Sequence, residues 1–325
     1  MIGVNRKIIL GLWLTLVLCL GPKGESLAVE KDVSRGLSHY IMGVMYDDLG
    51  DIDAAVQEYR RALELDKRAV IIRLNLAMAL IKQNNPDAAI AELKKASRYA
   101  PDSVEPHAIL ALIHSSRNNQ EEATREYEIA LKNALKLQPR NAAIYKNLGL
   151  IYLHQRKFDE ALEIFELVVN LRPDDAHAHF ILASIYHELK DFDRCEQALK
   201  TVLKLQVDFH PALNFLGYLY VEQSRNLDEA ERMIRAALEA EPVNGAYVDS
   251  LGWLFYQRGE YESALEQLEK AVLFLDDPVI FDHLGDTHLK LDNPAEAVKA
   301  WERSLELDPK QKKVRQKIHR SKKRR

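Results

Sequence analysis

The sequence predicts an all-α protein built as an α-solenoid of about eight helix-turn-helix repeats. Three observations predict this fold: similar phrases recur about every 34 residues, small residues recur at fixed places in every copy, and proline closes most copies. A period in this range is typical of repeat architectures, in which each unit buries its apolar faces against its neighbours. The composition, 47% hydrophobic and 29% charged, indicates a globular chain but does not separate two ordinary domains from a repeat array.

The first thirty residues differ in kind from the rest. Arg6 and Lys7 precede an uncharged, mainly apolar run from Ile8 to Leu20, and small residues stand at Ser26 and Ala28. This order is typical of a secretory signal peptide, so residues 1-28 are predicted to be removed by a cut after Ala28. The apolar run is shorter than the roughly 20 residues that a membrane-spanning helix needs. We therefore expect an exported protein, periplasmic or associated with the outer membrane.

Two alternatives to cleavage stay open. The signal could be retained as an anchor, or Cys19 could be lipidated. The sequence Leu16-Val17-Leu18-Cys19 resembles a bacterial lipobox, although Leu18 stands where a small residue is usual. Residues 29-35 are expected to form a short segment ahead of the first repeat.

The repeated phrase is clearest in KNLGLIYLHQRKFDEALEIFELVV, which starts at Lys146, and in DSLGWLFYQRGEYESALEQLEKAV, which starts at Asp249. All copies share a small residue in their first half: Gly43, Ala77, Ala111, Gly149, Ala183, Gly217, Gly252 and Gly285. A second small residue follows in their second half: Ala55, Ala89, Ala123, Ala161, Cys195, Ala230, Ala264 and Ala297. Helices approach closely only where side chains are small, so each copy is interpreted as two packed antiparallel helices, A and B.

The repeats are expected to span 36-69, 70-103, 104-141, 142-175, 176-209, 210-244, 245-277 and 278-309. The dipeptides Asn85-Pro86 and Asn293-Pro294 stand where a helix B should begin, because asparagine caps a helix and proline is accepted in its first turn. The third repeat is four residues longer than the usual unit. Its helix B is therefore predicted to be about one turn longer.

With these positions, the sequence resembles the tetratricopeptide repeat family over roughly residues 36 to 309. It is similar in particular to bacterial exported members that carry the phrases LGW and LGY, here at Leu251-Gly252-Trp253 and Leu216-Gly217-Tyr218. The resemblance implies a right-handed solenoid whose concave groove is lined by helix A. It also implies a non-enzymatic scaffold that binds a partner protein or an extended peptide in that groove, in a cell-envelope or export assembly.

The resemblance further implies which helix-A positions face the groove, and in the later repeats these hold aromatic and then acidic residues. The predicted partner-binding residues are Asn214, Tyr218, Asp249, Trp253, Tyr256, Asp282 and Asp286. Aromatic side chains offer rigid contact area, and an asparagine can bridge a peptide backbone. Asp282 and Asp286 would favour a basic ligand segment or the protein's own tail. A packing role for Trp253 and Tyr218 is equally open, and a solvated face is the default interpretation of the acids.

No catalytic residues, metal site or cofactor are predicted. The sequence holds neither the HExxH nor the CxxC spacing of a metal site, and its carboxylates follow surface helix faces. Beyond the signal, Cys195 is the remaining cysteine, so no internal disulfide is expected after cleavage. We therefore expect a protein that performs no chemistry of its own.

The net charge of −4 hides a strong asymmetry. Residues 310-325 carry ten Lys and Arg and no acid, whereas residues 29 to 309 hold 32 basic and 48 acidic residues. The tail is predicted to form a capping helix over the eighth repeat, with Val314 and Ile318 as its apolar contact, and to be disordered beyond Arg320.

Two alternative functions follow from the tail. The first is a membrane-surface adaptor that acts through an N-terminal anchor and the basic tail on anionic lipid. The second, less favoured because the protein is expected to be exported, is a nucleic-acid-binding repeat protein. No feature of the sequence predicts the identity of the partner or the oligomeric state.

Overall fold

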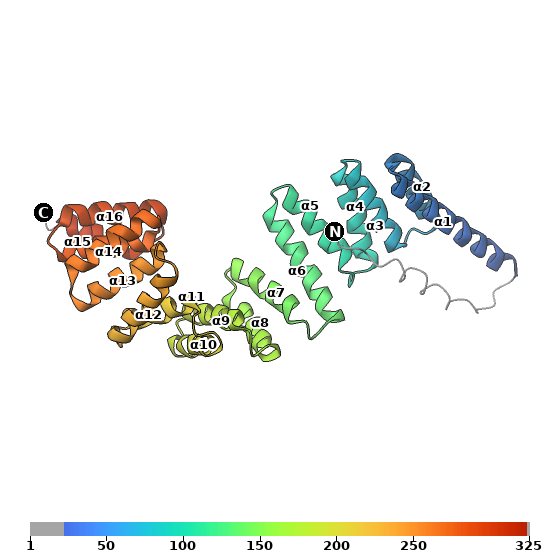
Figure 1. Cartoon of the computed structure of the whole chain (residues 1–325). Helices are drawn as coiled ribbons and strands as arrows, with labels where there is room; N and C mark the ends of the chain where they lie inside the picture. Colours follow the sequence, from blue (N-terminus) through green and yellow to red (C-terminus); the bar gives the residue numbers. More distant parts are fainter. Residues whose placement is uncertain (1–22, 324–325) are drawn as a thin grey trace. The chain divides into compact units, whose positions relative to one another are not determined.

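A computed structural model describes residues 23–323, with side chains from 32 to 322, and these residues form seventeen α-helices and no strand (Figure 1). The predicted all-α fold is thus confirmed. Their contacts divide the chain into two compact units, one ending at Pro139 and the other starting at Arg140. Residues 1–22, which hold most of the predicted signal peptide, lie outside the described residues.

The first unit contains repeats 1 to 3 and the second contains repeats 4 to 8. The helices of the first unit are α1 (Lys23–Leu49), α2 (Ile52–Leu65), α3 (Val70–Lys82), α4 (Pro86–Tyr99), α5 (Glu105–Ser116) and α6 (Gln120–Leu137). Those of the second are α7 (Ala142–His154), α8 (Phe158–Leu171), α9 (Ala176–Glu188), α10 (Phe192–Leu205), α11 (His210–Glu222), α12 (Leu227–Ala240), α13 (Gly245–Arg258), α14 (Tyr261–Phe274), α15 (Pro278–Lys290), α16 (Pro294–Leu307) and α17 (Lys312–Lys323).

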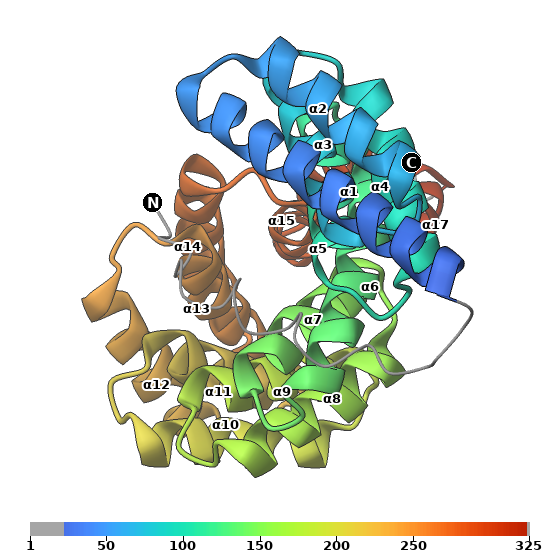
Figure 2. The ribbon, with the colours of Figure 1, turned by 90° about the vertical axis from the view of Figure 1, so that its right-hand side faces the viewer.

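Helices of one repeat pack as a pair, and within each unit a pair contacts the next. In the first unit, α1 lies against α2, α2 against α3, and α3 against α4 (Figures 1 and 2). In the second, α13 lies against α14, and α14 against α15. Odd-numbered helices up to α15 are therefore the A helices of the repeats, and even-numbered ones are the B helices.

The small residues mark the closest approach of helices A and B, as predicted. A Cβ atom added to Gly285 would lie 2.5 Å from Cδ1 of Trp301, and one added to Gly149 would lie 2.6 Å from Phe165. Trp301 and Phe165 are fully buried, so neither ring has room to move. The cysteine that replaces alanine in repeat 5, Cys195, is also fully buried. These residues hold the repeats together by packing.

Every turn between helices A and B has a residue with a positive φ angle at the same position in all eight repeats. These residues are Gly50, Asn84, Asn118, Arg156, Lys190, Ser224, Gly259 and Asp292. The left-handed conformation ends helix A and turns the chain toward helix B. Repeat 6, which has one extra residue, has a second left-handed residue at Asn226. The extra residue is therefore absorbed in the turn.

The long third repeat behaves as predicted. Helix α6 has 18 residues, whereas the B helices α2 and α4 have 14 each. Asn133 lies where a helix B of ordinary length would end, and it is buried. Its Nδ2 donates hydrogen bonds to the carbonyl oxygens of Pro101 and Ser103, at 2.9 and 3.1 Å. The added turn is thus fixed to the loop that precedes α5.

Both ends of the described chain are more helical than expected. At the N-terminal end, the expected segment 29-35 is part of α1. At the C-terminal end, α17 continues to Lys323, so the disorder expected beyond Arg320 was wrong for residues 321–323. The reason is that Ser321 is buried on the same face as Val314 and Ile318, which pack on Trp301. Within residues 23–323, no helix is both long and apolar enough to cross a membrane.

Candidate functional site

The residues predicted to bind a partner lie on three A helices of the second unit, α11, α13 and α15. Helix α11 contacts α13, and α13 contacts α15. Side chains that stand one repeat apart in the sequence therefore become neighbours across these helices.

Trp253 lies between two other rings. Its ring is stacked on Tyr256 at 4.4 Å between centroids and 10° between planes, and on His283 at 4.0 Å and 11°. Both faces of the indole are therefore covered, and only its edge is left for another molecule. Burial and the negative charge of Asp286 raise the pKa of Tyr256 to about 12. The stack includes Trp253 and Tyr256, two of the predicted site residues, but its third ring is His283 and not Tyr218.

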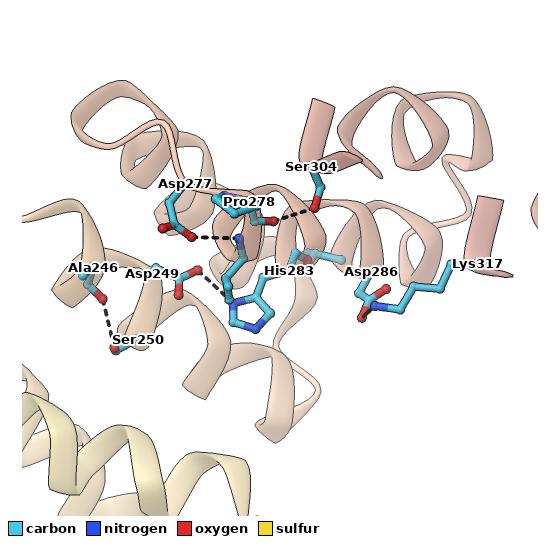
Figure 3. A network of polar contacts seen from close by, with 11 residues as sticks. Ala246, Asp249, Ser250, Asp277, Pro278, His283, Asp286, Ser304 and Lys317 are labelled. Atoms are coloured by element: carbon cyan, nitrogen blue, oxygen red, sulfur yellow. Dashed lines mark hydrogen bonds and ion pairs between the residues drawn. The ribbon is translucent and has the colours of Figure 1, made fainter. Parts of the chain in front are cut away.

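His283 forms a buried polar contact with Asp249 on the neighbouring A helix (Figure 3). Nδ1 of His283 lies 2.9 Å from Oδ1 of Asp249, and each side chain is 8% exposed. Burial disfavours a charged imidazole, but Asp249, assisted by Asp282 and Asp286, outweighs it and raises the pKa of His283 above its ordinary value. Asp249 is therefore committed to His283 and is not the exposed acid that was expected for a ligand.

Asp282 and Asp286 are paired with the protein's own tail. Nζ of Lys317 on α17 lies 2.7 Å from a carboxylate oxygen of each aspartate, and Figure 3 shows the Lys317 side chain beside Asp286. Burial raises the pKa of Asp286, although Lys317 favours its charged form. The sequence predicted that this acidic pair would bind either a basic ligand segment or the protein's own tail. In the structure it binds the tail.

Asn214 and Tyr218 lie on α11, the A helix that contacts α13. Asn214 is 9% exposed, and its Oδ1 is buried without a hydrogen-bond partner. It does not present the exposed amide that was expected to hold a peptide. Tyr218 is half-buried, and burial with the charges of Glu222 and Asp249 raises the pKa of its hydroxyl well above the ordinary value.

A second group of rings, on α9 and α11, was not included in the predicted site. Phe215 lies edge-on to Phe180 at 6.1 Å and to His187 at 5.2 Å, and Phe180 also contacts Phe209 at 5.3 Å. Phe180, His187 and Phe215 are half-buried. We call the A-helix side chains of repeats 5 to 8 the helix-A wall; its members are Phe180, His187, Phe215, Tyr218, Trp253, Tyr256, Asp282 and Asp286.

His283 and Lys317, which the sequence analysis did not include, could have been found from their spacing to the predicted residues. Asp249 contacts His283, which stands 34 residues later, and Asp282 contacts Lys317, which stands 35 residues later. The hydroxyl of Tyr40 accepts a hydrogen bond from Nδ2 of Asn75 across the same spacing of 35 residues. A residue at this position of helix A is thus met by the residue one repeat and one position further on, and comparing those positions would have indicated His283 and Lys317. Among the described residues, no three His, Cys, Asp or Glu side chains are grouped so as to hold a metal ion.

Two family descriptions match the sequence. "Tetratricopeptide repeat" matches residues 48–113, and "Tetratricopeptide repeat protein 21 C-terminal ARM domain" matches residues 130–322. Among solved structures, a tetratricopeptide repeat protein from Parabacteroides merdae is similar with a TM-score of 0.59 at 16% identity, covering 78% of this chain and 98% of that one. The structure of the "APC/C hetero-tetramer Cut9-Hcn1" is similar with a TM-score of 0.55 at 15% identity, covering 88% of this chain and 69% of that one. These likenesses confirm the predicted fold.

Two curated relatives are similar in sequence to this chain, and the match covers only part of each relative. The human "Protein O-mannosyl-transferase TMTC3" is 27% identical over 224 residues, which are 63% of this chain and 24% of the relative. The "TPR repeat-containing protein PA4667" of Pseudomonas aeruginosa is 24% identical over 250 residues, which are 77% of this chain and 36% of the relative. The chain therefore spans about a third or less of the length of these two relatives.

Proposed function

Because the chain belongs to the tetratricopeptide repeat family, we propose that it is a non-enzymatic scaffold that binds a partner protein or an extended peptide along the helix-A wall of repeats 5 to 8. A repeat solenoid of this family is consistent with protein–protein interaction. The family alone does not specify the binding surface or the partner, and we propose these below.

One observation carries the choice of surface: half-buried rings follow one another across the A helices of consecutive repeats. Phe180 and His187 on α9, Phe215 and Tyr218 on α11, and Trp253 and Tyr256 on α13 form this row. Large rings with few rotatable bonds give contact area at low entropic cost, which is why they dominate binding hot spots.

The geometry also indicates how the wall is used. Trp253 has both faces covered, so a partner meets the edges of the rings and does not insert a ring between them. The acids of the wall already have internal cations, since Asp282 and Asp286 share Lys317. We therefore expect apolar contact to supply most of the affinity. A basic partner segment would first have to displace Lys317.

The proposal includes export and a place in the cell envelope. The order of basic residues, apolar run and small residues in 1-28 supports a signal peptide, and a similar protein occurs in the bacterium Pseudomonas aeruginosa. The N-terminal sequence of the protein recovered from the periplasm tests this part: cleavage predicts a mature chain that begins at Val29. A chain that keeps Met1 or starts at Cys19 would support one of the anchored alternatives.

The proposal assigns no chemistry to the chain. The human relative is a mannosyl-transferase by name, but the match covers only 24% of its length. A match over so small a share of the relative does not support assigning mannosyl-transferase activity to this chain. Incubating the purified chain with a mannosyl donor and a protein acceptor tests this part, and transfer above that seen with heat-denatured chain would contradict it.

A membrane-surface adaptor is the second candidate, and one observation favours it. Helix α17 exposes Lys312, Lys313, Arg315 and Arg320, and it carries no acid. Such a face attracts anionic headgroups with about 1 kcal/mol per basic residue near the surface. Co-sedimentation with phosphatidylglycerol vesicles that is lost when these four residues are changed to Ser would support it.

The substitutions Tyr218→Ala and Tyr256→Ala, made together, test the scaffold proposal. A tagged chain is purified from its host with and without the pair, and co-purifying proteins are quantified by mass spectrometry. We expect unchanged helicity and loss of one main partner. Leu273→Ala is the matched control, because Leu273 is an exposed apolar residue of helix B in repeat 7. Loss of the same partner with Leu273→Ala would place the binding surface elsewhere.

A further inference from the structure

A cavity of about 400 Å³ lies in the first unit, between the B helices of repeats 1 and 2. Helix α3 forms its floor, through the buried side chains of Arg73, Leu76 and Leu80. Residues of α2 and α4 form its two sides, and α3 contacts both of these helices. A volume of this size is typical of pockets that hold a small molecule. The cavity is separate from the helix-A wall, which belongs to repeats 5 to 8.

Two alanines of α4 leave this space open. Ala88 and Ala91 line the cavity, and repeat 2 is the repeat that has alanine at both of these helix-B positions. In the other seven repeats, at least one of the two positions holds a longer polar side chain: Ala54 and Gln57, Glu122 and Arg125, Glu160 and Glu163, Arg194 and Gln197, Glu229 and Arg232, Ser263 and Glu266, Glu296 and Lys299. A longer side chain extends from the Cβ atom, so at Ala88 or Ala91 it would enter the space that these residues line.

One end of the cavity is built around a buried arginine. The side chain of Arg73 is 8% exposed, and its Nε is buried without a hydrogen-bond partner. Nη1 of Arg73 donates to Oε2 of Glu92, and Nη2 donates to the carbonyl oxygen of Lys67. Glu92 also accepts a hydrogen bond from Nζ of Lys95, at 2.7 Å. These contacts fix the guanidinium of Arg73 and gather Lys67 and Lys95 around it.

Positive charge is in excess in this cavity. It is lined by four cations and two carboxylates, namely Arg60, Lys67, Arg73 and Lys95 with Glu64 and Glu92. Arg73 and Lys95 share Glu92. Arg60 and Lys67 are exposed and form no salt bridge with the residues that the structure describes. The rest of the body is acidic, so this local excess of cations offers an anion a complementary site.

The other end of the cavity is apolar. Leu80 and Ala88 stand on either side of the turn that joins the antiparallel helices α3 and α4, so both lie near that turn. Arg73 and Lys95 lie toward the opposite ends of the same helices, and Leu76 lies between the two ends on the floor. From Arg73 to Leu80, α3 rises about 10 Å, at roughly 1.5 Å per residue. The cavity therefore runs from a basic end to an apolar end over the length of a short hydrocarbon chain.

We propose that this cavity binds a single-chain amphiphile with one negative charge, a medium-chain carboxylate. The carboxylate lies at the basic end, where Arg60 and Lys67 have donors to spare, and the chain runs along α3 toward Leu80. The headgroup gains charge-assisted hydrogen bonds, and the chain gains by leaving water. Glu64 and Glu92 also line the cavity, so they repel a phosphate headgroup, with its charge of about −1.5 to −2 at pH 7, more than a carboxylate.

Isothermal titration calorimetry of the purified full chain with octanoate tests the ligand class. Octanoate is expected to bind at least about tenfold more tightly than acetate, which lacks the chain, and than octanol, which lacks the charge. Octyl phosphate is expected to bind more weakly than octanoate. Equal affinity for octanoate and acetate, or no binding of octanoate, would overturn the proposal. Tighter binding of octyl phosphate would overturn the singly charged headgroup.

Removal of charge tests where octanoate binds. Arg60→Gln with Lys67→Gln is expected to weaken octanoate binding about tenfold, because the headgroup loses two cations. The matched control is Lys94→Gln with Arg98→Gln, which changes two exposed bases of α4 that do not line the cavity. This control should bind octanoate as the wild type does. An equal loss in both double variants would mean that the net charge of the chain, and not the cavity, attracts the ligand.

Filling the cavity is a second test of the location. Ala88→Gln with Ala91→Gln is expected to abolish octanoate binding, because the new side chains enter the space that the hydrocarbon chain needs. Glutamine already stands at the equivalent of Ala91 in repeat 1, Gln57, so the variant should keep the helicity of the wild type. Ser263→Gln makes the corresponding change in repeat 7 and should leave octanoate binding unchanged. Undiminished binding in the folded Ala88→Gln, Ala91→Gln variant would overturn the proposal.

Discussion

Nδ1 of His283 lies 2.9 Å from Oδ1 of Asp249, and this pair links the A helices of repeats 7 and 8 inside the protein. The imidazole is also stacked on Trp253, so one residue joins the polar contact to the ring stack of the helix-A wall. Removing the positive charge from this position leaves Asp249 buried without its cation. The pair should therefore make stability depend on pH.

The pH dependence has a definite sign. The pKa of His283 is raised by folding, so its contribution is fully present below the unfolded histidine pKa of about 6.5 and is lost as the pH rises through the folded value. We expect the wild type to exceed His283→Gln in unfolding free energy by more at about pH 6 than at about pH 8. Urea unfolding at both pH values measures this difference. An equal difference at both would mean that folding does not change the pKa of His283.

Glycine in helix A is required where a large ring faces it. Gly285→Ala places a methyl group against the buried Trp301, and overpacking costs about 1–3 kcal/mol, which exceeds the helix-propensity gain of up to about 1 kcal/mol. In Gly36→Ala the new Cβ meets Leu65 at 3.5 Å, an ordinary contact, so this variant should be as stable as the wild type or more so. Thermal unfolding of both variants checks the contrast. Equal destabilisation would show that the loss comes from the backbone and not from Trp301.

The left-handed turn residue predicts stabilising substitutions. Arg156 and Lys190 have φ angles of 57° and 61°, where a side chain costs roughly 1 kcal/mol. Lys190→Gly should therefore raise the unfolding free energy by about 0.5 kcal/mol, the gain being reduced by the greater freedom of glycine in the unfolded chain. Gln197→Gly, at an exposed position in the interior of helix α10, should instead lower it by about 0.5–1 kcal/mol. Denaturant titration of the two glycine variants and the wild type measures these changes in unfolding free energy. A loss in Lys190→Gly would mean that its side chain makes a stabilising contact.

The tail helix is a structural cap through its apolar face. Ile318 is 9% exposed and packs in the cluster that covers Trp301, so Ile318→Ala should cost about 2 kcal/mol or more. Lys313→Ala, which changes an exposed residue of the same helix, should stay within about 0.5 kcal/mol of the wild type. Unfolding followed by tryptophan fluorescence reports on both. Similar stability of the two variants would show that α17 is not required as a cap.

The fold could be predicted because the small residues that its helix packing requires recur at regular intervals in the sequence. Ala55 and its counterparts, with Gly285 facing Trp301, obey a constraint that one repeat imposes on the next. The left-handed residues could be predicted only in part. Glycine stands at Gly50 and Gly259, whereas Lys190 gives no hint of a positive φ angle.

The candidate site was predicted less completely, because exposure depends on what a neighbouring repeat supplies. Trp253 and Tyr256, two of the predicted site residues, lie stacked on one another. Asp249 was expected to be an open acid, but His283 on the next repeat covers and pairs it. Such pairings are set by contacts between repeats, and a single repeat examined alone does not reveal them.

The most direct test of the helix-A wall is site-specific photo-crosslinking in the living host. A photoreactive phenylalanine replaces Tyr256 in one strain and the exposed Leu273 of helix B in another, and adducts are identified by mass spectrometry. The proposal predicts one main protein adduct at Tyr256 that is absent at Leu273. Adducts of the same protein at Leu273 alone, with none at Tyr256, would contradict it and place the partner on the B helices.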